Sequence, residues 1–112
     1  MKINDLNNKI INGDSLKELK KIPNESFDLV FADPPYNLQL RKKLTRPDRS
    51  KVNAVNDKWD KFKNFKKYDE FCLSWLKECK RILKKNGSLW VIGTYHNIFR
   101  LGTIIQDFGF WI

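Results

Sequence analysis

Residues that hold metals or form disulfides are scarce in this sequence. It has one histidine, His96, and two cysteines, Cys72 and Cys79, among 112 residues. The cysteines lie seven positions apart in one stretch with a helical pattern, too far apart for a disulfide within it, and no Cys-x-x-Cys occurs. We therefore expect no metal site and two reduced thiols, which are typical of a cytoplasmic protein.

Long apolar runs are also missing. No stretch approaches the roughly 20 apolar residues of a membrane span. The first residues, Met1 to Asp5, lack the apolar segment of a signal peptide. The sequence thus predicts a chain with no membrane partner. Its length suffices for one small domain.

The positive charge is abundant and concentrated in one segment. The net charge is +9, and the segment from Arg41 to Lys67 holds eleven Lys or Arg against three Asp, a net of +8. Aromatic residues lie between these charges, a combination that suits a polyanion with bases to stack upon. A charge run is also commonly a solvated surface, so both interpretations stay open. The candidate DNA contacts are Arg46, Arg49, Lys51 and Trp59.

Apolar periodicity alternates between strand and helix along the chain. The predicted strands are 9–12, 26–32, 88–93 and 110–112, and the predicted helices are 15–22, 68–85 and 98–107. Ser15 is the expected N-cap of the first helix, with Glu18 completing a capping box. Residues 37–67 show no clear period and are expected to form a long loop with room for short helices. This order predicts an α/β fold with a mostly parallel sheet.

Polar features follow three of these elements. They are Asp14, the run Asp33-Pro34-Pro35-Tyr36 and the group Thr94–Asn97. In parallel sheets ligands bind beyond the carboxyl ends of the strands, so we expect all three at one edge.

The run at 33–36, called here the Pro-Pro corner, has a distinctive chemistry. Each proline keeps the preceding residue extended, and neither has an N–H, so the chain cannot begin an ordinary helix there. A carboxylate, free carbonyls and an aromatic face are presented to one small volume. Such a corner suits a flat substrate whose exocyclic amine is held by two acceptors.

The Pro-Pro corner after an apolar strand resembles the catalytic motif of β-class amino-group DNA methyltransferases. Its surroundings resemble the N-terminal part of the cell-cycle-regulated (CcrM-type) DNA adenine N6-methyltransferases. The matching segments are 11–16, 30–40, 46–48 through 59–62, and 90–100. The resemblance implies a Rossmann-like class I methyltransferase fold, S-adenosylmethionine as cofactor, double-stranded DNA as partner, a GANTC target and a bacterial, nucleoid-associated location.

The resemblance also implies roles for single residues. The Asp33 carboxylate and the Pro34 carbonyl would accept from the amine, and Tyr36 would stack on a base extruded from the duplex. Pro35 completes the catalytic motif, and Asp33 also faces the cofactor. Asp14 would lie near the cofactor's adenine, although an Asp that holds a turn is an alternative. Thr94, His96 and Asn97 would lie near the target pocket without a fixed role.

The family's glycine-rich cofactor turn is not found, because the five glycines never form Gly-x-Gly. We therefore expect residues 1–112 to be an N-terminal fragment that lacks the strands of the cofactor motif, exposes apolar edges and is inactive alone. A cytosine N4-methyltransferase is an alternative, disfavoured because those enzymes more often carry Ser before Pro-Pro-Tyr. A non-catalytic DNA-binding module is another. A homodimer is left open.

Overall fold

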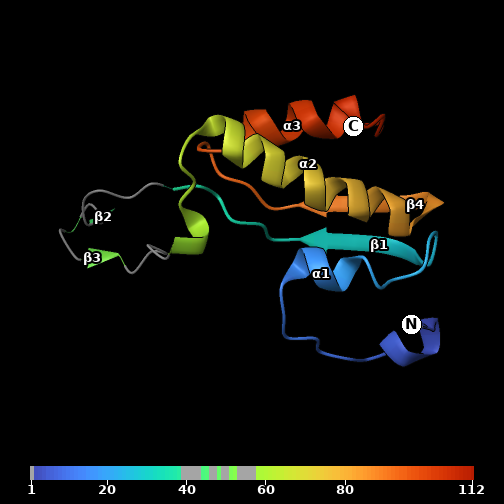
Figure 1. Ribbon diagram of the computed structural model, residues 1–112. Helices are drawn as coiled ribbons and strands as arrows, with labels where there is room; N and C mark the ends of the chain where they lie inside the picture. The colour runs from blue at the N-terminus through green and yellow to red at the C-terminus, as the bar shows by residue number, and fades with distance from the viewer. Residues whose placement is uncertain (1, 39–43, 46–47, 49–50, 53–57) are drawn as a thin grey trace.

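The structure is a computed structural model that describes residues 2–38, 44–45, 48, 51–52 and 58–112. Its elements are η1 (Ile3–Leu6), α1 (Ser15–Leu19), β1 (Phe27–Ala32), β2 (Leu44–Thr45), β3 (Lys51–Val52), η2 (Lys58–Asp60), α2 (Phe65–Ile82), β4 (Leu83–Val91) and α3 (Ile98–Asp107). Helices and strands alternate around a small parallel sheet (Figure 1). The α/β class is confirmed.

The sheet that carries the Pro-Pro corner consists of β1 and β4, which pair in parallel. Their register joins Val30 to Leu89 and Phe31 to Trp90, after an irregularity between Phe27 and Leu29. Beyond the last pair, the Ile92 N–H donates to the Ala32 carbonyl at 2.9 Å. The two strands therefore end together, and the residues that follow them leave the sheet at the same edge.

The helices cover one face of this sheet. Residues of β1 and β4 that point to this face pack against a core built mainly from α2. Trp75 and Leu76 of α2 and Leu101 of α3 are buried there, and Leu16 of α1 packs against the same cluster. α2 is thus the central helix, and it packs against the sheet that carries the Pro-Pro corner.

The opposite face of the sheet is apolar and open. Leu29 is 53% exposed, and the paired aromatic residues Phe31 and Trp90 are each 65% exposed. Within the described part of the chain no element covers them. The exposed apolar surface is therefore a face of the sheet, to which Trp90 belongs, rather than the strand edges expected from the sequence.

Two predicted strands do not form. Residues 9–12 and 110–112 have no strand hydrogen bonds, and the side chains of Ile10 and Trp111 are fully exposed. A strand needs a paired neighbour to satisfy its backbone groups, and the described residues provide none for either segment. An apolar run alone was therefore not sufficient to predict a strand.

The limits of α2 also differ from the prediction. The helix begins earlier, because the side chain of Asn64 accepts from the Lys67 N–H at 2.9 Å and caps it. It ends at Ile82, because Leu83 already pairs with Phe27 in the sheet. Residues 84–87 consequently lie in β4 rather than in a final helical turn.

The segment predicted as a loop contains short elements. β2 and β3 form an antiparallel pair that lies away from the helices and the main sheet (Figure 1). η2 then leads the chain back to α2. In the described ranges no helix is long and apolar enough to cross a membrane.

Candidate functional site

The Pro-Pro corner directly follows β1 and presents its carboxylate to solvent. Asp33 is exposed, whereas Pro34, Pro35 and Tyr36 are half-buried. The Tyr36 hydroxyl donates a hydrogen bond to Oδ1 of Asp33. This bond, with smaller contributions from burial and the negative charges of Asp33 and Asp60, raises the pKa of Tyr36 to about 12. The Asp33 carboxylate, which is expected to accept from a substrate amine, therefore already accepts from the Tyr36 hydroxyl.

A second interaction holds the corner from the helix side. The Tyr68 hydroxyl donates to the Pro35 carbonyl at 2.7 Å, and Nδ2 of Asn97 donates to the Tyr68 oxygen at 2.9 Å. Both side chains are almost completely buried, and burial raises the pKa of Tyr68. The Pro35 carbonyl is thus occupied, while the Pro34 carbonyl forms no hydrogen bond with the described residues.

A third interaction fixes the backbone just after the prolines. Asp60, at the end of η2, is 3% exposed and accepts from three consecutive backbone N–H groups. Oδ1 lies 2.7 Å from the nitrogen of Tyr36 and 3.1 Å from that of Asn37, and Oδ2 lies 3.0 Å from that of Leu38. Asn37 has a φ of 58°, which turns these donors toward one acceptor.

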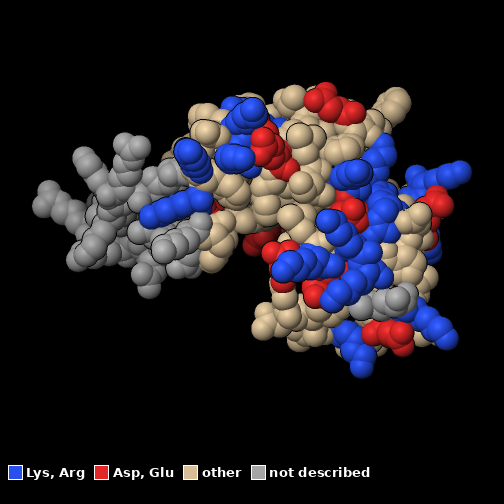
Figure 2. All heavy atoms as spheres, viewed as in Figure 1, with Lys and Arg blue, Asp and Glu red and all other residues tan. Residues whose placement is uncertain are grey.

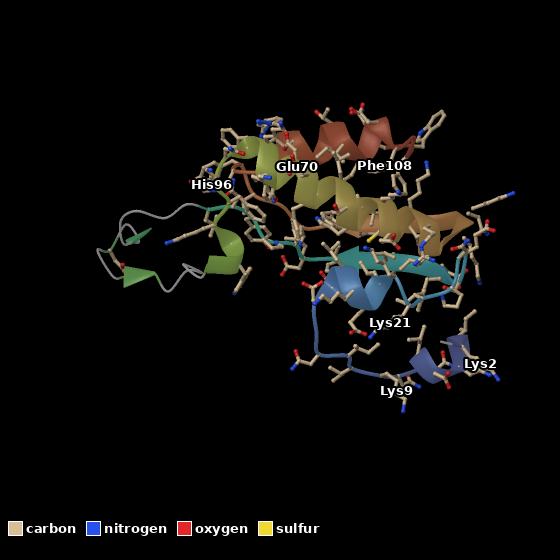
Figure 3. All side chains as sticks on the ribbon, viewed as in Figure 1. Lys2, Lys9, Lys21, Glu70, His96 and Phe108 are labelled. Carbon is tan, nitrogen blue, oxygen red and sulfur yellow. The ribbon has the colours of Figure 1, made fainter. Side chains whose placement is uncertain are left out.

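The group after β4 lies at the same sheet edge as the corner, as predicted, and is linked to it through Tyr68. Oδ1 of Asn97 accepts from the Thr94 N–H at 2.8 Å, so Asn97 links this turn to Tyr68 and hence to Pro35. The ring of His96 stacks on Tyr95 with centroids 4.2 Å apart, and Figure 3 places His96 at this end of the molecule. Asn97 is therefore a structural link, while His96 remains near the corner.

Asp14 has a clear local role. It is the N-cap of α1, and its Oδ1 accepts from the Lys17 N–H at 3.0 Å. The prediction of Ser15 as the cap is wrong, since Ser15 is the first helical residue, and Glu18 pairs with Lys21 instead. Figure 1 shows α1 beginning at the end of the sheet where β1 finishes, but no hydrogen bond joins Asp14 to the corner.

The candidate DNA contacts are placed only in part. Arg46 and Arg49 lie outside the described residues, and of Lys51 the backbone alone is described, paired with Thr45. Trp59 is 57% exposed and directly precedes Asp60. Figure 2 shows further Lys and Arg side chains over α1 and α2, with acidic side chains interspersed among them.

Other chemistry has little support in the described ranges. No group of three or more His, Cys, Asp or Glu there has the geometry to hold a metal ion. Cys72 and Cys79 are buried and unpaired, and burial raises the pKa of each thiol to about 11. A groove of about 980 Å³ runs along β4 toward Phe110 and Ile112, but Asp33 does not line it.

Sequence reasoning missed two residues of this site, Asp60 and Tyr68. They contact the corner across 24 and 33 positions, and no local pattern indicates such pairings. The segment that contains Asp60 did carry a signal, because residues 59–62 resemble the CcrM-type enzymes. That resemblance implied no role for Asp60.

Comparison with known proteins decides the family. The family model described as DNA methylase, of the N6 and N4 methyltransferase type, matches residues 27–112. The chain belongs to the DNA methylase family. It is 56% identical over 110 residues to the Type II methyltransferase M.HinfI of Haemophilus influenzae, covering 98% of this chain and 31% of that protein. It is 35% identical over 103 residues to the Type II methyltransferase M2.DpnII of Streptococcus pneumoniae, covering 92% of this chain and 38% of that protein. This DNA methylase chain thus spans about a third of the length of these relatives.

Proposed function

We propose that residues 1–112 form the catalytic-motif part of a DNA adenine N6-methyltransferase. The observation that supports this most is the geometry of the Pro-Pro corner: the carboxylate of Asp33 is exposed, and the adjacent Pro34 carbonyl accepts no hydrogen bond from the described residues. The Pro35 carbonyl and the following N–H groups are already occupied by Tyr68 and Asp60. The Pro34 carbonyl and the Asp33 carboxylate, once the amine replaces the Tyr36 hydroxyl there, would give two acceptors, as many as an exocyclic amine has N–H bonds.

The chemistry follows from the properties of adenine. Its N6 is a poor nucleophile because the lone pair is delocalised into the ring. Acceptors at Asp33 and Pro34 would draw the two N–H bonds out of the ring plane, free the lone pair and stabilise the positive charge that develops on N6. Tyr36 would stack on the base, which has to leave the duplex to expose N6. Holding the amine in line then supplies much of the rate.

The methyl group would come from S-adenosylmethionine when it is bound. In the described part of the chain, Asp14 is the residue that fits this cofactor. Its Oδ1 caps α1, and its Oδ2 makes no hydrogen bond there, so it is available to accept from an adenine amine. Asp33 directly follows β1, at the end of the sheet where α1 begins, and the resemblance places the methyl donor there.

A GANTC target and double-stranded DNA as partner belong to the same proposal, supported by the resemblance to CcrM-type enzymes and by the basic segment 37–67. A cytoplasmic, nucleoid-associated location follows from that partner. Cytosine N4 is the alternative substrate, disfavoured by Asp rather than Ser at position 33.

We further propose that methyl transfer needs a segment equivalent to the other two thirds of the relatives. The open apolar face around Phe31 and Trp90 supports this, because such surfaces are usually covered in a working domain. Appreciable methylation of a GANTC duplex by residues 1–112 alone would contradict it.

A chimera tests the proposed function. In it, residues 1–112 replace the matching segment of the Haemophilus influenzae relative, to which they are 56% identical. We expect methyl transfer to a GANTC duplex, with N6-methyladenine as product and little transfer to a duplex of scrambled sequence. N4-methylcytosine as product would favour the alternative enzyme. A chimera that binds DNA and S-adenosylmethionine without methyl transfer would favour the non-catalytic module.

A further inference from the structure

Asp60 occupies an unusual position for a carboxylate in a basic segment. Its side chain is 3% exposed, whereas the preceding Trp59 is 57% exposed. A buried carboxylate is costly unless its oxygens are hydrogen-bonded. Here both oxygens accept from backbone N–H groups, and all three donors belong to the residues that complete or follow the Pro-Pro corner.

The sequence explains why those donors need an outside acceptor. Pro34 and Pro35 have no N–H, so Tyr36 is the first residue after them that can donate. The positive φ of Asn37 turns the chain so that it enters neither a helix nor a strand, and residues 36–38 lie outside every regular element. Asp60 thus satisfies a row of donors that local structure leaves unpaired.

The remaining contacts complete the attachment. The Pro35 carbonyl is held by Tyr68, and the side-chain oxygen of Asn37 accepts from the Phe62 N–H at 3.3 Å. The corner is therefore held from α2 on one side and from η2 on the other. Neither α2 nor η2 holds the two groups that the proposed function assigns to the base, namely the Asp33 carboxylate, which accepts from Tyr36, and the Pro34 carbonyl.

We propose that Asp60 is a positioning residue for methyl transfer. It fixes the backbone that orients the Asp33 and Pro34 acceptors and the Tyr36 ring, and it anchors the neighbouring Trp59 to the same backbone. This inference rests on the proposed function. A misplacement of about 1 Å at a reacting centre can cost about 100-fold in rate. Asp60 touches neither base nor cofactor in this account, so its loss should lower kcat more than it weakens binding.

Two substitutions in the chimera test this. Asp60→Ala removes all three acceptor contacts, and Asp60→Asn keeps one oxygen for two of them while placing an NH2 group opposite the Leu38 N–H. Asp107→Asn is the matched control, because Asp107 is exposed and lies at the end of α3, with no hydrogen bond to the corner. We expect kcat to fall about 100-fold in Asp60→Ala and about 10-fold in Asp60→Asn, following the cost of misplacement. The KM for S-adenosylmethionine should change less than threefold in both, and the control should match the parent.

A structural readout separates positioning from folding. In residues 1–112 with Asp60→Asn, amide hydrogen exchange should rise at Leu38 more than at core residues such as Leu76. If Asp60→Ala does not fold, Asp60→Asn decides. A kcat within threefold of the parent, or a loss matched by equal increases in both KM values, would overturn the inference. An inactive parent chimera would instead count against the proposed function.

Discussion

The Tyr36 hydroxyl donates a hydrogen bond to the carboxylate of Asp33, which lies three residues earlier, directly after β1. The bond occupies the acceptor that the proposed mechanism assigns to the adenine amine. Entry of the base would therefore exchange an O–H donor of the protein for an N–H donor of the substrate. The carboxylate stays hydrogen-bonded in both states, so little is lost when the exchange occurs.

This relationship predicts different effects for two changes at Tyr36. Tyr36→Phe removes the hydroxyl but keeps the ring, so kcat of the chimera should stay within about threefold of the parent. Tyr36→Ala also removes stacking on the base, which is worth about 1–3 kcal/mol, and should lower kcat/KM by about 5- to 150-fold. Steady-state kinetics with a GANTC duplex measures both. Equal losses in the two variants would show that the ring does not stack on the base.

Trp59 provides a test of the DNA interface. It is exposed beside Asp60, and if its indole stacks on a base, Trp59→Ala should weaken duplex binding by about 5- to 150-fold. Phe99→Ala is the control, since Phe99 is 82% exposed and belongs to α3 rather than to the basic segment. Fluorescence anisotropy of a labelled duplex gives both affinities. If the two variants bind alike, Trp59 is not a DNA contact.

The open face of the sheet predicts self-association of residues 1–112 on their own. Phe31 and Trp90 are register partners on this face, and both are largely exposed. Phe31→Ser combined with Trp90→Ser should reduce binding of the dye ANS and shift sedimentation toward the monomer. The same number of changes on the helix side, such as Phe99→Ser with Thr103→Ala, should have little effect. Unchanged dye binding in the Phe31→Ser, Trp90→Ser variant would show that this face is not the surface through which the chain self-associates.

The two buried thiols predict a loss of stability in alkali. Burial raises the pKa of Cys72 and of Cys79 from 9.0 to about 11, so both stay protonated in the folded chain at pH values where the unfolded chain releases its protons. Their contribution is complete below pH 9 and is lost as the pH rises toward 11. One pKa unit corresponds to about 1.4 kcal/mol, so the free energy of unfolding should fall by about 2–4 kcal/mol between pH 8 and pH 10.5.

Urea unfolding at the two pH values measures this fall. The matched variant, Cys72→Ala with Cys79→Ala, should be less stable at pH 8 but should lose less stability in alkali. Some loss should remain, because burial also raises the pKa of Tyr68. Equal losses in the variant and the parent would exclude the thiols as the cause.

The parts of the fold that were predicted from the sequence are those set by local pattern. α3 occupies the predicted residues, because its apolar side chains, such as Leu101 and Ile104, recur at helical spacing and are buried. The strand before Asp33 was predicted for the same kind of reason. Residues 9–12 and 110–112 failed because a strand depends on a neighbour that the sequence of the segment does not specify.

The site shows the same division. The corner at 33–36 was identified from its own residues, since two prolines after a strand restrict the backbone wherever they occur. The partners that hold it, Asp60 and Tyr68, are distant in sequence and became visible only when α2 and η2 were placed against β1. The sequence predicted Ser15 as the cap of the first helix, whereas Asp14 caps it by accepting from the Lys17 N–H.

The most direct test of the role of Asp33 is the rate of methyl transfer to a GANTC duplex by the chimera with Asp33→Ala. Base extrusion is followed separately, from the fluorescence of a duplex that carries 2-aminopurine at the target adenine. Asp33 is exposed and lies outside the core, so the variant should fold, bind DNA and extrude the base as the parent does. Because it lacks one of the two acceptors for the amine, its single-turnover rate should fall by about 100- to 1,000-fold. A rate within tenfold of the parent, with base extrusion intact, would show that this carboxylate does not hold the amine and would contradict the central claim.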